Sequence, residues 1–168
     1  SKGLPSMNLI GLARGAARES MIRVRSALIT LGVQCHSMRL VANLLPAELP
    51  KDTSGLDLPL AVAMLAASGH IPEEKLQARR FFGELALNGK LESVRGAVLV
   101  TDLARQQGDK EILLPVENAE EAAIIPDIKV IGIRDLEQAK AYLEGKIEIQ
   151  PTLASNDMHS SAHIPCLS

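Results

Sequence analysis

The segment Phe81–Val94, FFGELALNGKLESV, gives the clearest indication of the fold of this chain. Its two largely apolar runs, residues 81–87 and 90–94, flank the pair Asn88-Gly89. Such a pair between apolar runs is the strongest short-range hairpin signal, because both residues tolerate the positive φ angles of a tight turn. The segment therefore predicts an antiparallel hairpin in the middle of the chain.

On the C-terminal side of the hairpin, the pattern alternates between helix and strand. Apolar residues at helical spacing, with Gly108 and Gly145 as stops, predict three helices, at residues 96–107, 117–125 and 135–145. Asp135 is expected to cap the last helix. Short β-compatible runs predict strands at residues 111–114 and 128–133.

On the N-terminal side, a helix is expected from Ala16 to Leu31, followed by Gly32 as its cap. Runs at residues 7–12 and 39–45 are β-compatible. Asp57 is predicted to be the N-cap of a second helix, residues 58–68, which is apolar nearly all round and should be buried. Residues 71–80 are expected to form a polar connector.

This order of elements indicates an α/β (α+β) domain, with a mixed sheet of parallel βαβ units and one β-hairpin. The 168 residues suit a single domain, expected over residues 1–146, and residues 147–168 are expected to form a polar tail or linker.

Composition excludes several classes of function. The longest apolar run, Leu58–Ala67, has ten residues, whereas a membrane-spanning helix needs about 20. The two cysteines, Cys35 and Cys166, form neither a disulfide framework nor a zinc pattern, so a reducing cytoplasm is expected. Only 2% of residues are aromatic, which is too few for a large stacking platform for single-stranded nucleic acid.

Charge is unevenly distributed along the chain. Residues 1–40 carry six bases and one acid, a net charge of +5, whereas residues 41–168 carry −7. A basic segment can bind phosphate or an acidic partner. An ordinary solvated helix face, with ion pairs such as Glu19 with Arg23, explains the same residues. The candidate contacts to DNA or to a protein interface are Arg14, Arg18, Arg25, Arg39 and Lys51.

Several short motifs, taken together and in order, resemble one bacterial family. They are Gly3-Leu4-Pro5-Ser6, Asn8–Leu12, Arg18-Glu19-Ser20, Arg23-Val24-Arg25, Pro46-Ala47, Leu49-Pro50-Lys51, Asp57-Leu58-Pro59, Gly83–Leu87, Val94-Arg95-Gly96, and Pro115 with Asn118. They resemble the N-terminal domain of the magnesium-chelatase-like AAA+ proteins of the ComM/YifB family. The match covers residues 3–145, and the family's domain has further strands before Gly3.

This resemblance implies a fold like the proteolytic domain of Lon, also seen in a ribosomal protein. It implies a parent protein that is a ring-forming, hexameric ATPase and DNA helicase, involved in branch migration and natural transformation. ATP and magnesium would be used by an AAA+ module of that parent, and no cofactor or metal is expected in this chain. The expected partners are that module, further copies in the ring and DNA, with no membrane.

The same resemblance places the catalytic serine of Lon-type proteases at Asp57 and their lysine near Val98. Asp57 has no hydroxyl to attack a carbonyl, and Val98 has no amine to take up the proton of one, so no catalytic residue is expected and the chain is not expected to be an enzyme. Two alternatives remain open. One is a divergent, ATP-dependent Ser–Lys peptidase that uses Ser54 or Ser93. The other is a subunit of a magnesium chelatase.

Overall fold

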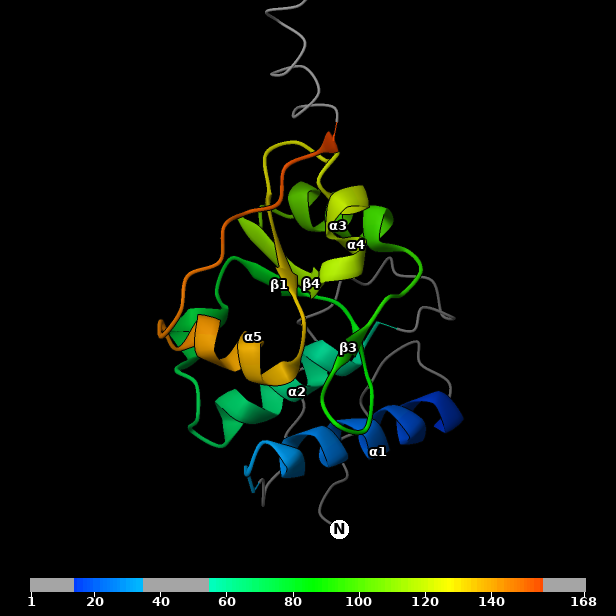
Figure 1. The fold of residues 1–168 in the computed structure, drawn as a ribbon, viewed down its shortest axis with the longest axis vertical. Helices are drawn as coiled ribbons and strands as arrows, with labels where there is room; N and C mark the ends of the chain where they lie inside the picture. Colours follow the sequence, from blue (N-terminus) through cyan, green and yellow to red (C-terminus); the bar gives the residue numbers. More distant parts are fainter. Residues whose placement is uncertain (1–13, 35–54, 156–168) are drawn as a thin grey trace, which may run out of the picture.

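A computed structural model describes residues 14–34 and 55–155, with the backbone alone in residues 14–18 (Figure 1). The helices are α1 (Arg14–Thr30), α2 (Asp57–Ala67), α3 (Ala97–Gln106), α4 (Val116–Ala122) and α5 (Leu136–Leu143), with a 3-10 helix, η3 (Glu73–Leu76). The strands are β1 (Arg79–Phe81), β2 (Glu84–Leu85), β3 (Leu91–Glu92), β4 (Glu111–Pro115) and β5 (Lys129–Ile133). All five predicted helices are confirmed. The predicted strands at residues 7–12 and 39–45 lie outside the described residues.

Three parallel strands form the centre of the domain, in the order β1-β4-β5. Alternate residues of β4 face opposite sides of this sheet. Leu113 belongs to the core shared with α2 and α5, whereas Ile112 and Leu114 belong to the core shared with α3 and α4. Both faces of the sheet are therefore covered by helices, as parallel sheets require. The α/β class predicted from the sequence is confirmed.

Helix α1 forms an outer layer beyond α2 (Figure 1). Its residues Val24, Ala27 and Leu28 are almost fully buried and join the core of α2 and α5. The layers thus run from α1 through α2 and α5 to the sheet, and then to α3 and α4. Helices α1 and α4 lie towards opposite ends of the longest axis in Figure 1.

The Asn88-Gly89 turn forms as predicted, between β2 and β3. Leu85 pairs with Leu91 across the hairpin, and the Asn88 side chain accepts a hydrogen bond from the Lys90 N–H at 3.0 Å. Gly89 has a φ angle of +92°, which favours glycine. Within the described residues, the hairpin and the three parallel strands are two separate sheets.

The prediction of one continuous strand over residues 81–87 is wrong. Phe81 ends β1 in the parallel sheet, and the chain then turns at Gly83 into the hairpin. A Cβ atom at Gly83 would lie 2.8 Å from Leu91 Cδ2 and 3.2 Å from the Pro115 ring, so a side chain at this turn would require its neighbours to shift. The polar connector expected at residues 71–80 also contains η3 and the first two residues of β1.

Asp135 caps α5 as predicted, and its carboxylate accepts a hydrogen bond from the Gln138 N–H at 2.7 Å. Beyond α5, the chain returns along the edge of the sheet (Figure 1). The Thr152 N–H donates to the Val130 carbonyl at 2.8 Å, and Ala154 is buried. The segment predicted to be a polar tail thus begins in contact with the domain.

Candidate functional site

The Asp57 carboxylate lies in the first turn of α2 and is completely buried. It accepts hydrogen bonds from the Ser20 hydroxyl and from the Leu85 backbone N–H, the latter at 2.9 Å. The Arg23 guanidinium donates to both of its oxygens, from Nε to Oδ2 at 2.6 Å and from Nη2 to Oδ1 at 3.2 Å. We call these four groups the Asp57 node. They tie α1, α2 and β2 together through one carboxylate.

The Arg23 guanidinium lies close to two carboxylates, those of Asp57 and Glu84. The hydrogen bond from Arg23 to Asp57 raises the pKa of the Arg23 guanidinium above its usual value. Arg23 Nε also lies 3.8 Å from Glu84 Oε2, at the start of β2. Burial raises the pKa of the Glu84 carboxyl, although the Arg23 charge opposes that shift. The Asp57 carboxylate therefore has its hydrogen-bonding partners within the fold, as a buried charge requires.

The predicted role of Asp57 as an N-cap is wrong. Leu56 occupies the N-cap position of α2, and no side chain donates or accepts a capping hydrogen bond there. Asp57 is instead the first residue of the helix. Its carboxylate accepts hydrogen bonds from donors in α1 and β2 instead. The bond from the Arg23 guanidinium is charge-assisted and is therefore stronger than a hydrogen bond to a backbone N–H at a helix cap.

Sequence reasoning missed the roles of Ser20 and Arg23. The alternative pairing of Arg23 with Glu19 also differs from the structure, in which the short ion pair of Arg23 is with Asp57. One signal could have pointed to the node. Asp57 directly precedes residues 58–68, which were predicted to be a buried helix and contain no charged residue. A carboxylate drawn into the interior with that helix requires a charged or hydrogen-bonding partner.

Val98, near the position of the lysine in Lon-type proteases, is the half-buried second residue of α3. Its side chain has no amine, and Asp57 has no hydroxyl. In the alternative Ser–Lys peptidase, Ser93 would act with Lys90. Both side chains are exposed beside the hairpin. Ser54 and Lys51 lie outside the described residues.

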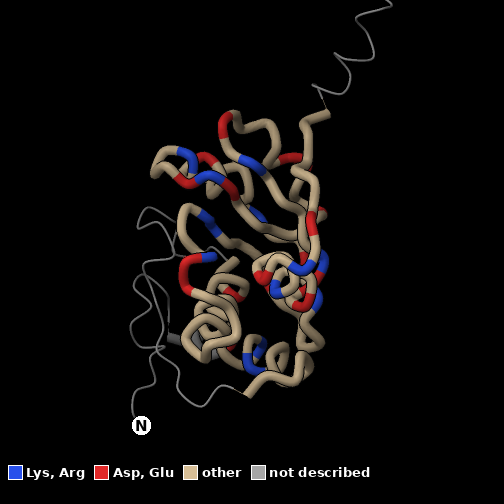
Figure 2. Tube along the Cα trace, turned by 90° about the vertical axis from the view of Figure 1, so that its left-hand side faces the viewer, with Lys and Arg blue, Asp and Glu red and all other residues tan. Residues whose placement is uncertain are grey.

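The candidate contact residues fall into two groups. Arg14, Arg18 and Arg25 all lie in α1, and the Arg25 side chain is exposed. Arg39 and Lys51 lie outside the described residues. Along the described trace, Lys and Arg positions alternate with Asp and Glu positions (Figure 2).

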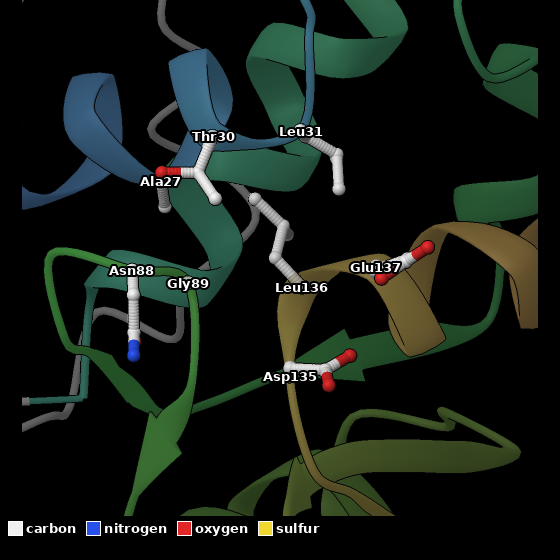
Figure 3. A pocket seen from close by; sticks show the side chains of 8 residues that line it. All are labelled: Ala27, Thr30, Leu31, Asn88, Gly89, Asp135, Leu136 and Glu137. Atoms are coloured by element: carbon white, nitrogen blue, oxygen red, sulfur yellow. The ribbon is translucent and has the colours of Figure 1, made fainter.

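A pocket of about 160 Å³ opens between the end of α1, the hairpin turn and the start of α5 (Figure 3). The Leu136 side chain points towards Ala27 and Thr30 of α1 and towards Leu31, which follows the helix. The Asp135 carboxylate at its rim already caps α5. The pocket lining combines the apolar side chains of Ala27, Leu31 and Leu136 with the polar side chains of Thr30, Asn88, Asp135 and Glu137.

A second polar cluster lies at the start of the parallel strands. The Tyr142 hydroxyl of α5 donates to Glu111 Oε1 of β4 at 2.7 Å, and Arg79 Nε of β1 lies 3.4 Å from Glu111 Oε2. The Arg79 guanidinium lies 5.6 Å from the centroid of the Tyr142 ring. Burial and the Glu111 carboxylate together raise the pKa of Tyr142 to about 12. This cluster joins α5 to the sheet edge.

Residues 14–34 and 55–155 contain no group of three or more His, Cys, Asp or Glu side chains placed to hold a metal ion. In the same described part of the chain, no helix is both long and apolar enough to cross a membrane.

Comparison with known proteins places the chain in a family. The family model of subunit ChlI of Mg-chelatase matches residues 1–118. Protein YifB of Salmonella typhimurium is 38% identical over 156 residues, 93% of this chain and 31% of YifB. Competence protein ComM of Haemophilus influenzae is 36% identical over 146 residues, 87% of this chain and 28% of ComM.

A more distant relative is Lon protease 2 of Bacillus subtilis, which is 25% identical over 146 residues, 87% of this chain and 25% of that protease. This match is consistent with the Lon-like fold that the sequence motifs imply. The chain spans about a third or less of the length of each of these relatives. On the match to the ChlI model and on its likeness to YifB and ComM, the chain belongs to the magnesium-chelatase-like ComM/YifB family.

Proposed function

We propose that this chain is a non-catalytic domain of a ComM-like AAA+ ATPase and DNA helicase that acts in branch migration and natural transformation. Within that parent, the domain serves ring assembly, DNA guidance or partner docking. ATP and magnesium are used by the AAA+ module of the parent and not by this chain. The domain works in the cytoplasm as part of a homo-hexamer.

The Asp57 node is the observation that carries the non-catalytic part of this proposal. Asp57 stands where the resemblance to Lon-type proteases places the nucleophile, yet its carboxylate is completely buried and accepts bonds from Ser20, Arg23 and the Leu85 N–H. A nucleophile must be exposed to its substrate and activated by a base. A carboxylate enclosed by donors of the same chain stabilises the fold instead.

The relatives of this chain also favour a role in natural transformation over peptidase activity. The relative ComM of Haemophilus influenzae is a competence protein, which favours a role for this chain in natural transformation. The identity to Lon protease 2 is lower, at 25%. At the two positions where the Lon resemblance places a serine and a lysine, this chain has Asp57 and Val98.

A labelling experiment tests the absence of peptidase chemistry. The purified chain is treated with a fluorophosphonate probe, which reacts with activated serine hydroxyls. We expect no labelling above that of the heat-unfolded chain. Labelling of the folded chain that is lost in Ser93→Ala or Ser54→Ala would overturn the proposal in favour of a divergent Ser–Lys peptidase.

The match to the ChlI model favours a second candidate, a magnesium chelatase subunit that inserts metal into a tetrapyrrole. Disruption of the gene in its native host separates the two functions. Our proposal expects fewer recombinants from transforming DNA and an unchanged tetrapyrrole content. A loss of magnesium tetrapyrrole, with normal recombination, would establish the chelatase function instead.

A further inference from the structure

Helix α4 packs on the domain with one side and leaves the other side exposed. Its residues Ala119 and Ala122 are buried. On the other side, Val116 is 50% exposed, and Ile124, which follows the helix, is 59% exposed. Val116, Glu120 and Ile124 recur at four-residue spacing, and backbone hydrogen bonds continue the turn beyond Ala122. These three residues therefore lie on one side of the helix.

The exposed side of α4 is acidic. Residues 116–127 contain four acidic residues and no lysine or arginine. All four acidic side chains are exposed. We define the acidic α4 face as Val116, Glu117, Glu120, Glu121 and Ile124. A surface of this composition would repel a phosphate backbone, so DNA does not fit it. It suits a protein surface that carries basic groups around an apolar centre.

The last residues that the structure describes lie against the same helix. The Ser155 hydroxyl donates to Glu120 Oε2 at 2.5 Å. Leu153, two residues earlier, is 61% exposed and adds a third large apolar side chain near the face. In Figure 1 this segment ends, in red, beside the turn that joins α4 to β5. A module that follows this domain in a longer protein is therefore attached next to the acidic α4 face.

We propose that the acidic α4 face is the docking surface for the AAA+ module that follows this domain in the parent protein. The module contributes lysines or arginines that pair with the three glutamates of the face. Apolar side chains of the module pack on Val116, Ile124 and Leu153. This inference rests on the proposed function, which supplies the module.

The point of attachment favours α4 over the other exposed apolar residues. Linking two parts of one chain gives them a high effective concentration, which is highest for surfaces that the linker can bring together. Ile22 and Ile29 are also exposed, but they lie in α1, towards the opposite end of the domain (Figure 1). The acidic α4 face is the one beside the attachment point.

Carboxyl labelling tests the contact. A carbodiimide couples glycine ethyl ester to exposed glutamates, and mass spectrometry measures the extent at each residue. The chain of 168 residues is compared with the full-length parent, diluted until sedimentation shows single copies. Labelling of Glu117, Glu120 and Glu121 should be several-fold lower in the parent, because the module covers them. The exposed Glu73 and Glu74 of η3 should be labelled equally in both proteins.

Two matched variants of the parent locate the contact. Ile124→Asp places a charge at the apolar centre, so labelling of the three glutamates should return to the level of the chain of 168 residues. Ile22→Asp changes an isoleucine of α1 that is similarly exposed, at 57%, and should leave the three glutamates protected.

Three results would overturn the inference. The first is equal labelling of the three glutamates in the chain and in the single-copy parent. The second is protection that is present only in the assembled ring, which assigns the face to a second copy. The third is protection that Ile124→Asp leaves in place. ATP hydrolysis by the parent tests the proposed function separately. A parent that hydrolyses no ATP contradicts the proposed function, whereas an active ATPase with fully labelled glutamates contradicts only this inference.

Discussion

The Arg23 guanidinium of α1 binds both carboxylate oxygens of Asp57 in α2, at 2.6 and 3.2 Å, across 34 positions of sequence. The acid is completely buried, whereas the Arg23 side chain keeps 26% of its surface exposed. The pair therefore fixes an outer helix to a buried one at the point where the Lon resemblance places a nucleophile.

Replacement of Arg23 by leucine should strongly destabilise the domain. The Asp57 carboxylate would remain buried without its cation, and removing one partner of a buried ion pair costs about 3–5 kcal/mol. Urea unfolding followed by circular dichroism measures the loss. The matched control is Ile29→Ala in the same helix, where a side chain that is 73% exposed should change the free energy of unfolding by less than about 1 kcal/mol. Equal effects of the two substitutions would show that the ion pair contributes little.

Tyr142, the one tyrosine of the chain, allows its own titration to be measured. Its folded pKa of about 12 lies above the ordinary value of 10.0, so the folded state holds the phenolic proton more tightly than the unfolded state does. The contribution of Tyr142 to stability is therefore complete below pH 10.0 and is lost as the pH rises towards 12. Tyrosinate absorbance should give the higher pKa in the folded chain and the ordinary one in urea.

The variant Glu111→Gln is the control for that titration. It removes the carboxylate that accepts the hydrogen bond from Tyr142, so the tyrosine pKa should fall towards its ordinary value. An unchanged pKa in this variant would mean that burial alone causes the shift.

The amide group of Asn118 should contribute to the stability of the fold beyond the volume that its side chain fills. This buried side chain accepts from the Val94 N–H at 3.0 Å and donates to the Val94 carbonyl at 2.9 Å, which fixes the chain before α3 to α4. In Asn118→Asp the donor is lost and a carboxylate oxygen faces the carbonyl. Because an unsatisfied buried group costs about 1–3 kcal/mol, thermal unfolding should show a clear loss. Glu117→Gln, next to it on the exposed face, should unfold like the wild type.

The helices could be predicted because their signals are local. The apolar spacing of residues 16–31, the Asn88-Gly89 pair and the Asp135 cap each depend on residues a few positions apart, and each is confirmed. The parallel strands are covered by helices on both faces, so their sequences do not alternate between apolar and polar residues. No local pattern therefore indicated that residues 81–87 belong to two strands separated at Gly83. At Gly83 the backbone leaves the sheet for long-range partners. Its N–H donates to the Gly55 carbonyl and its carbonyl accepts from the Leu58 N–H, both at 2.9 Å.

The candidate site was predicted less completely. The sequence singled out Asp57 as a position of interest, but a cap at a helix start and an ion pair with a distant helix look identical in the local sequence. Only the packing of α1 on α2 brings Ser20 and Arg23 to the carboxylate. Long-range contacts of this kind are set by tertiary structure and leave no periodic pattern in the chain.

The free energy of unfolding of Asp57→Ser tests the central claim most directly, because it installs the residue type that Lon-type proteases carry there. Loss of the carboxylate leaves Arg23 and the Leu85 N–H without their acceptor. We predict a destabilisation of roughly 2–4 kcal/mol in urea unfolding. A variant as stable as the wild type would contradict the account, because Asp57 would then not be the group that holds α1, α2 and β2 together.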